Sequence, residues 1–284
     1  MTETTIPNNP LSKHFRQPST YIKLTSGGKY WKEGTLDLPV TGEIPVYPMT
    51  AKDEIMLRTP DALINGTSVV EVIQSCCPSI KNAWAMPSVD VDSTLIAIRI
   101  ASYGSSMSIT AKCAKCNEEH DYDIDLQKVL SGIRMPDYNE TVTTDDGLII
   151  KLKPIDYLQV SKSGNTVFEE EKLIQALADP NLSEEVRTVE FERHIKNMIN
   201  ININNVTIAT ESILTSDAIV TDPKFISDYY RNAKSVVIRQ VQNKIKGFGA
   251  IVGIKEEEAI CISCDTKFKL VVEFDYSHFF DNGF

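Results

Sequence analysis

The amino-acid sequence predicts an α+β fold, a helical body that carries several β-hairpins. Apolar residues recur at helical spacing behind capping residues in much of the chain. Strand-like alternation brackets two Cys-x-x-Cys motifs, and turn residues divide the alternating runs into hairpins. A chain of 284 residues is long enough to bury the core of one large domain or of two small ones.

The N-terminal quarter predicts an extended segment followed by helices. Residues 1–20 are polar and contain three prolines, so we expect an extended arm that is disordered alone or lies along a partner. The run 21–47 predicts short strands separated by turns. Thr50 and Asp53 have the spacing of a capping box, which predicts a helix start. A second start is predicted at Thr59-Pro60.

Two helices and two hairpins are predicted next. Valines and an isoleucine at 69–73 predict a short helix that ends before Pro78. Asp90 to Asp92 are expected to cap a helix that runs to Gly104 and is buried, because it is apolar on most sides. The alternating run 106–126 predicts a hairpin with thiols at its tip, and a second hairpin is predicted at 141–152, turning at 145–147.

The rest of the chain predicts mostly helix and then a last hairpin. One helix is expected over 168–178, and Ser183 is expected to cap the next, with Asn200 to Asn205 breaking it. A long helix is expected from Asp222-Pro223 to Gly247. The final hairpin is expected over 259–274.

These elements predict three parts in the chain. Residues 1–20 form the arm, residues 21–154 together with 247–284 form a zinc-stapled α+β domain, and residues 155–246 form a mostly helical insert.

Composition and charge exclude several classes of protein. Hydrophobic residues make up 42% of the chain and charged residues 24%, and the net charge is −10 without any run of Lys or Arg. Binding to a phosphate backbone depends on clustered basic side chains, so nucleic acid is not an expected partner. No apolar run approaches the roughly 20 residues of a membrane helix. The first 17 residues contain no apolar signal core, so secretion is not expected either.

The motif that carries chemistry is a pair of Cys-x-x-Cys knuckles, one near the middle of the chain and one near its end. Six cysteines without a secretion signal indicate a reducing compartment, where paired thiols are more often metal ligands than disulfides. A structural zinc ion takes four ligands in a tetrahedron, and each hairpin turn directs two sulfurs to one side. We therefore predict one zinc-ribbon-like four-cysteine site, with the ligands Cys113, Cys116, Cys261 and Cys264.

Other interpretations of these residues stay open from the sequence. One alternative is that the two cysteine pairs are separate motifs that do not meet. Another is a redox-active pair, although redox-active Cys-x-x-Cys motifs usually lie after a strand at the start of a helix. His120 is an alternative ligand, and Asp121, Asp123 and Asp125 share one face of a strand, which is typical of a solvated face. The adjacent Cys76-Cys77 pair is expected to be buried core thiols.

No catalytic motif accompanies the cysteines. The sequence contains no Gly-rich phosphate loop, no nucleophile elbow and no His-Glu-x-x-His motif. A zinc ion with four cysteine ligands has no open coordination position, so the predicted site is structural. We do not expect an enzyme.

Several segments resemble a family of phage proteins. The run Tyr47–Glu54 resembles the Tyr-Pro-Met-Thr-Ala-Lys-Glu-Glu segment of baseplate hub and tail-assembly proteins in T-even-like contractile-tailed phages. The Gly27-Gly28 entry, the apolar run 92–104, both cysteine knuckles and the closing Phe279-Phe280 pair are similar to that family as well. The resemblance covers about 20–130 and 255–280, and the middle of the chain matches no part of the family.

The resemblance implies a structural role without catalysis. It implies a component of the virion baseplate in the hub region, needed for tail assembly and assembled in the host cytoplasm. The implied partners are other baseplate or tail proteins and the tape-measure protein, with several copies in a symmetric assembly. Phe279-Phe280 either anchors such an interface or packs into the core of the chain.

Three alternative functions remain at this point. The first is a tail-assembly chaperone that acts on the tape-measure and hub complex and is absent from the finished particle. The second is a zinc-dependent hydrolase that uses His120 or the neighbouring aspartates. The third is a nucleic-acid-binding zinc ribbon, which the acidic charge disfavours.

Overall fold

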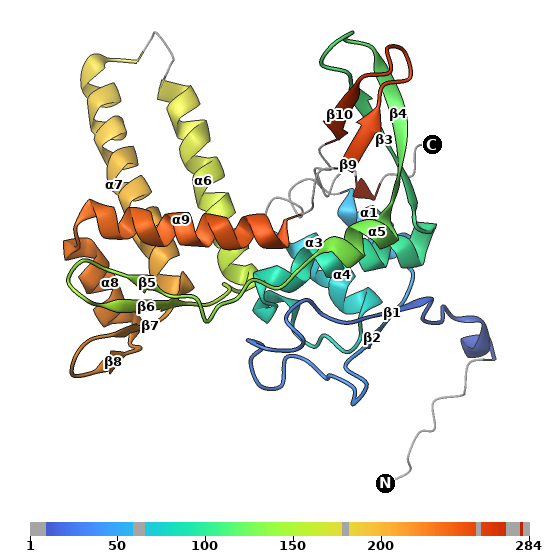
Figure 1. Cartoon of the computed structure of the whole chain (residues 1–284), viewed down its shortest axis with the longest axis horizontal. Helices are drawn as coiled ribbons and strands as arrows, with labels where there is room; N and C mark the ends of the chain where they lie inside the picture. The colour runs from blue at the N-terminus through green and yellow to red at the C-terminus, as the bar shows by residue number, and fades with distance from the viewer. Residues whose placement is uncertain (1–9, 59–65, 178–181, 254–256, 271–278, 281–284) are drawn as a thin grey trace.

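The computed structural model describes residues 10–58, 66–177, 182–253, 257–270 and 279–280. They form the predicted α+β fold, with helices and small antiparallel sheets. Figure 1 shows a central body with two projections, the helices α6 (Tyr157–Leu177) and α7 (Glu184–Ala209) on one side and two β-hairpins on the other. Within the described part of the chain, no helix is long and apolar enough to cross a membrane.

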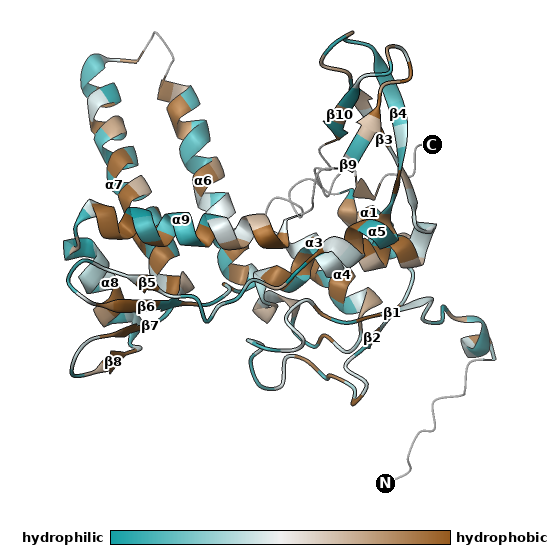
Figure 2. Cartoon of the chain, viewed as in Figure 1, coloured by the Kyte–Doolittle hydropathy of each residue, from teal (hydrophilic) through white to brown (hydrophobic). Residues whose placement is uncertain are grey.

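The first core is built mainly from the N-terminal half of the chain. Its elements are β1 (Thr20–Ile22) paired antiparallel with β2 (Ile44–Val46), α1 (Ala51–Leu57), α3 (Thr67–Cys76), the short 3-10 helix η2 (Ala83–Ala85), α4 (Ser88–Tyr103) and α5 (Leu126–Gly132). The predicted capping box is present, because Thr50 and Asp53 each accept a hydrogen bond from the backbone N–H of the other. Figure 2 shows hydrophobic segments in the region of α1, α3, α4 and α5.

Helix α4 is buried as predicted but begins earlier than predicted. It starts at Ser88, whereas the sequence placed its cap at Asp90 to Asp92. The carboxylate of Asp90 does not cap the helix, because it accepts hydrogen bonds from Ser26 and Trp31 of the segment that follows β1. This aspartate therefore fixes the N-terminal loop to the helix.

The ends of the chain also contribute to the first body. In the predicted arm, which contains the 3-10 helix η1 (Ser12–His14), Arg16 donates hydrogen bonds to the carbonyl oxygens of Pro48 (2.6 Å) and Ser75 (2.8 Å). The described end of the arm thus contacts its own chain. Phe279 and Phe280 are buried in the first core. The helix start predicted at Thr59-Pro60 lies outside the described residues.

The second core lies against a four-stranded antiparallel sheet. The sheet contains β5 (Val142–Thr143), β6 (Ile149–Leu152), β7 (Thr210–Leu214) and β8 (Ile219–Val220) in this order. The predicted hairpin at 141–152 supplies β5 and β6, with Gly147 at a φ of +83° in its turn. Because β6 pairs with β7, strands from both sides of the predicted boundary at 154 share one sheet, and the division into domain and insert stays a prediction.

The helix break predicted at Asn200 to Asn205 is wrong, because α7 continues through it to Ala209. Asparagine disfavours helices when its side chain competes for the local backbone. Here the side-chain oxygens accept hydrogen bonds from other helices instead: Asn200 from Arg231, Asn202 from Gln242 and Asn205 from Ser163. Tertiary contacts therefore override the local preference.

The long helix predicted from Asp222 to Gly247 is two helices. The chain forms α8 (Pro223–Asn232) and α9 (Ser235–Val252), with extended backbone at Ala233 and Lys234 between them. Asp222 caps α8 as predicted, but Gly247 lies inside α9. The helix predicted at 168–178 begins much earlier, at the start of α6.

Candidate metal centre

The first knuckle is the turn between β3 (Ser106–Lys112) and β4 (Glu119–Asp125), which form the predicted hairpin. The backbone N–H of Cys113 donates to the carbonyl oxygen of Glu118, and the N–H of Asn117 donates to the carbonyl oxygen of Cys113, both at 2.9 Å. Asn117 has a φ of +62°, a conformation that asparagine tolerates better than most residues. The turn thereby directs both sulfurs to one side.

The second knuckle repeats this geometry between β9 (Glu257–Ile260) and β10 (Lys267–Leu270). The N–H of Cys261 donates to the carbonyl oxygen of Thr266, and the N–H of Asp265 donates to the carbonyl oxygen of Cys261, again at 2.9 Å. Asp265 has a φ of +54°. The hairpin is present as predicted through Leu270, and its predicted end at 271–274 lies outside the described residues.

The four sulfurs of the two knuckles lie together. Cys113 Sγ is 3.7 Å from Cys264 Sγ, Cys116 Sγ is 3.5 Å from Cys261 Sγ, and all four atoms lie within 4.8 Å of one another. In a tetrahedron with zinc–sulfur bonds of about 2.3 Å, adjacent sulfurs are about 3.8 Å apart. None of these thiols is in a disulfide. The donor set and its spacing therefore fit a tetrahedral metal ion.

Contacts beside the sulfurs hold the two hairpins against each other. His120 Nε2 lies 2.7 Å from Ser263 Oγ, and the ring of Tyr122 packs edge-on against Phe268 at a centroid distance of 5.5 Å. Figure 1 shows the two hairpins together in one projection. His120 thus contacts the opposite knuckle through its ring and does not belong to the sulfur cluster.

Local groups shift the pKa of Cys113, Cys116 and Cys264 in different directions. Backbone N–H groups of Cys116 and Lys115 lower the pKa of Cys113. Hydrogen bonds with the side chain and backbone of Thr266 lower the pKa of Cys264 to about 6. The backbone N–H of Glu118 lowers the pKa of Cys116, but burial and the neighbouring thiols raise it overall to about 12. These hydrogen bonds therefore favour the thiolate form of Cys113 and of Cys264, which is the form that binds metals.

The other residues considered from the sequence lie outside this cluster. Asp121 accepts a hydrogen bond from Thr110, and Asp125 caps α5 by accepting from the N–H of Gln127. Among the described residues, the four cysteines are the one group of three or more potential ligands that lies close together. Cys76 and Cys77 are buried as predicted, and burial raises the pKa of Cys76 to about 12, which makes this thiol inert.

Sequence reasoning missed the residues that shape and join the knuckles. Asn117 and Asp265 each follow the second cysteine directly, so the chain carries a repeated Cys-x-x-Cys-(Asn/Asp) pattern. That repeat is a usable signal, because Asn and Asp are the non-glycine residues that most often adopt positive φ. The contact between His120 and Ser263 joins residues far apart in the chain, and no local pattern predicts it.

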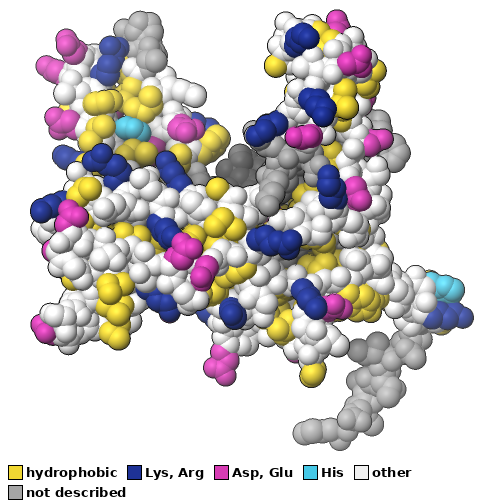
Figure 3. Space-filling model, viewed as in Figure 1, with side chains coloured by type: hydrophobic (Ala, Val, Ile, Leu, Met, Phe, Trp, Pro, Cys, Tyr) yellow, Lys and Arg dark blue, Asp and Glu magenta, His cyan; other side chains and the backbone are white. Residues whose placement is uncertain are grey.

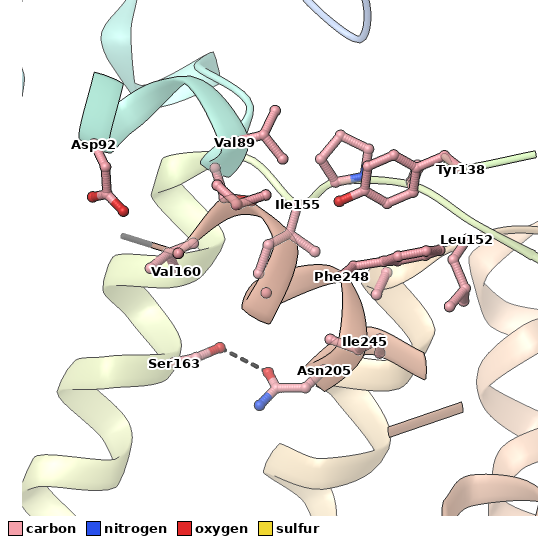
Figure 4. A pocket seen from close by; sticks show the side chains of 17 residues that line it. Val89, Asp92, Tyr138, Leu152, Ile155, Val160, Ser163, Asn205, Ile245 and Phe248 are labelled. Carbon is pink, nitrogen blue, oxygen red and sulfur yellow. Dashed lines mark hydrogen bonds between the residues drawn. The ribbon is translucent and has the colours of Figure 1, made fainter. Parts of the chain in front are cut away.

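A separate pocket of about 440 Å³ lies where the start of α4, the segment 153–155 and the helices α6, α7 and α9 meet. Figure 4 shows that its labelled side chains are mostly apolar, with Ser163 donating a hydrogen bond to Asn205 on its wall. Asp92 and Lys153 are its charged lining residues. This lining contains no arrangement of nucleophile and base that would indicate catalysis.

A family model described as "T4 bacteriophage base plate protein" matches residues 21–281, which includes both knuckles. No curated protein and no solved structure matches the chain.

Proposed function

Because the chain belongs to the T4 bacteriophage base plate protein family, we propose that it is a structural subunit in the hub region of a contractile-tail baseplate and is needed for tail assembly. The family membership gives the chain a structural role in a phage baseplate, a place in the virion tail and contacts with other tail or baseplate proteins. The resemblance of Tyr47–Glu54 to hub proteins supports the hub position and the requirement for assembly.

The second part of the proposal is that Cys113, Cys116, Cys261 and Cys264 hold one structural zinc ion. The observation that carries it is the spacing of the four sulfurs, all within 4.8 Å. The inner cysteines are separated by the 144 residues from 117 to 260. Closing a loop of that length costs about 4 kcal/mol in chain entropy, whereas zinc binding to four such ligands is worth roughly 10–16 kcal/mol. The metal offsets the closure and stabilises the joined hairpins.

The proposed zinc site does not catalyse. Four thiolates fill a tetrahedral zinc ion and leave no position for water or substrate. His120, Asp121 and Asp125 are engaged with Ser263, Thr110 and the start of α5, which argues against a hydrolytic site beside the knuckles.

For partners, we propose neighbouring baseplate proteins and the tape-measure protein, with several copies arranged in a symmetric assembly. Assembly would take place in the host cytoplasm before the tail is complete. An acidic body, with a net charge of −10, suits docking onto basic surfaces of neighbouring subunits.

Quantitative mass spectrometry of purified tails tests the proposed function. A structural subunit is expected at a fixed number of copies per tail, in a ratio that matches the tail symmetry. A tail-assembly chaperone would be abundant in infected cells and absent from purified tails, and that result would contradict the structural role.

A further inference from the structure

The pocket of about 440 Å³ between α4, α6, α7 and α9 lies apart from the metal centre. Its floor is apolar, because Val89, Leu152 and Phe248 line it and are buried. Lys153 and Gly249 also line it and are exposed, so the pocket opens to the surface. Pockets of about 300–1,000 Å³ with mostly apolar walls are typical binding sites for small molecules.

The hydroxyl of Tyr138 is a polar group of this floor without a partner in the described part of the chain. Tyr138 is only 8% exposed, and its hydroxyl makes no hydrogen bond with any described residue. The ring packs on Phe248 at a centroid distance of 4.6 Å, and Figure 4 shows the hydroxyl directed toward Ile155. Burial raises the pKa of Tyr138 to about 12, so the hydroxyl keeps its proton at neutral pH. Because buried hydroxyls almost always have a partner, this donor points to a ligand that accepts its hydrogen bond.

An ordered water is a poor partner for this hydroxyl. A buried water needs two to four polar partners. Among the described lining residues that are buried, Tyr138 is the one with a polar side chain. The other polar side chains of the lining are half-buried or exposed: Ser88, Asp92, Lys153, Ser163 and Asn205. A water at Tyr138 would therefore find a single side-chain partner on the floor.

The volume of the pocket indicates the size of the ligand. A benzene molecule occupies an engineered apolar cavity of about 150 Å³ in another protein, so a pocket of about 440 Å³ has room for two or three such rings. A single aromatic side chain from a neighbouring protein would fill only about a third of the space. Unfilled space forfeits packing contacts. The volume therefore favours a free small molecule over an inserted side chain.

The charges around the pocket indicate an uncharged ligand. Asp92 and Lys153 are the charged lining residues, one of each sign, and neither is buried. Figure 3 shows Lys and Arg side chains mixed with Asp and Glu over one face of the molecule. We propose that the pocket binds one uncharged small molecule of two or three rings, with an oxygen or nitrogen acceptor placed at the hydroxyl of Tyr138.

Gly249 keeps one wall of the pocket open. It lies inside α9, where glycine is less favourable than alanine. A Cβ atom at Gly249 would contact no packed group within 4 Å, and the same is true of Gly247, which is exposed on the same helix and does not line the pocket. A large side chain is therefore tolerated at either position, and only the one at 249 lies at the pocket.

Photo-labelling of the purified full-length chain with benzophenone tests the proposal. Benzophenone is uncharged, has two rings joined by a carbonyl acceptor, and attaches to nearby C–H groups under light. We expect one saturable adduct per chain, mapped by mass spectrometry to residues that line the pocket, in the segments 152–163 and 245–253. The absence of an adduct, labelling that does not saturate, or adducts that map elsewhere would overturn the proposal.

Substitutions separate binding in the pocket from labelling of any apolar surface. Gly249→Phe and Val160→Trp add bulk from α9 and α6, and each is expected to reduce labelling at least tenfold, whereas Gly247→Phe is expected to change it less than twofold. Tyr138→Phe keeps the ring and removes the donor, so the concentration for half-maximal labelling should rise about fivefold. Thermal scans check that each variant is folded. Full labelling of both bulky variants, an equal loss in Gly247→Phe, or an unchanged half-maximal concentration for Tyr138→Phe would contradict the proposal.

Discussion

At the scale of single residues, Asp90 joins the N-terminal loop to helix α4. Its carboxylate is fully buried and accepts hydrogen bonds from the backbone N–H and hydroxyl of Ser26, both at 2.6 Å, and from the indole N–H of Trp31 at 2.8 Å. Burial raises the pKa of this carboxyl group, although the bonds from Ser26 and Trp31 oppose the shift. Three donors, two of them on the buried Ser26 and one on the half-buried Trp31, therefore share this acceptor group.

Asp90→Ala is therefore expected to lower the free energy of unfolding by about 2–4 kcal/mol, because it leaves those donors without a partner in the core. Chemical denaturation followed by Trp fluorescence measures the change. Asp37→Ala, at an exposed position, is the control and is expected to stay within about 0.5 kcal/mol of the wild type. Equal effects of the two substitutions would show that the contacts of Asp90 do not stabilise the loop.

Among the elements, the two knuckle turns resemble each other most closely. Both place a residue with positive φ directly after the second cysteine, Asn117 in one and Asp265 in the other. The left-handed conformation costs an ordinary L-residue roughly 1–2 kcal/mol, and a β-branched side chain is the least tolerant. These two positions therefore limit which sequences can form the turns.

Asn117→Val is expected to destabilise the protein by about 1–2 kcal/mol, whereas Asn117→Gly is expected to be close to neutral, because glycine adopts positive φ without strain. Thermal unfolding of the metal-loaded protein measures both. Ala114→Val, in the same turn but not at a positive φ, separates the backbone effect from the added bulk. If valine is as well tolerated at position 117 as at 114, the turn does not need the left-handed residue.

The contact of Glu170 in α6 with His194 and Asn197 in α7 should make a pH-dependent contribution to stability. Hydrogen bonds from Asn197 and His194 lower the pKa of Glu170 from its ordinary value of 4.5. A carboxyl group with a lowered folded-state pKa stabilises the protein above its unfolded-state pKa, and this contribution disappears as the pH falls through the folded-state value. The difference in urea midpoint between wild type and Glu170→Gln should shrink as the pH falls from about 6 to below the lowered pKa.

Glu169→Gln is the matched control for this experiment, since Glu169 is the exposed neighbour of Glu170. Its difference from wild type should stay constant over the same pH range. A pH-independent difference for Glu170→Gln would mean that the ionised carboxylate does not hold the two helices together.

The elements also show how far sequence reasoning reaches. Features that depend on neighbouring residues are predicted correctly, including the capping box at Thr50 and the start of α7 at Ser183. The meeting of the four cysteines is a distant contact, and it is predicted because two Cys-x-x-Cys pairs together supply the four ligands of one tetrahedral site. Other distant contacts leave no local pattern in the sequence. Asn200 to Asn205 stay helical because other helices bind their side chains, and the pairing of β6 with β7 joins strands separated by the whole of α6 and α7.

At the scale of the whole molecule, the two hairpins connect positions at opposite ends of a long stretch of sequence. The segment from 117 to 260 contains most of the second core, and it has to return on itself for the two knuckles to lie together. Without a metal ion, the contacts of His120 with Ser263 and of Tyr122 with Phe268 would remain between the two hairpins. We therefore expect the joined hairpins to be the part of the fold that depends on zinc.

Removal of the metal should lower the melting temperature by about 20 °C or more, because a contribution of roughly 10 kcal/mol corresponds to 2–4 °C for each kcal/mol in a chain of this size. Circular dichroism during a thermal scan, with and without a strong chelator, measures the shift. The same chelator should have no further effect on Cys261→Ser. A wild-type scan that the chelator leaves unchanged would argue that the fold does not rely on a bound ion.

The zinc content of the purified full-length chain, measured by elemental mass spectrometry and divided by the protein concentration, tests directly whether the four cysteines hold a metal ion. We expect one zinc ion per chain in the wild type and a loss of at least tenfold when Cys113 and Cys261 are both replaced by Ser. A wild-type protein that is folded and contains no zinc, or a variant that keeps its zinc, would show that the cysteines do not form a structural zinc site.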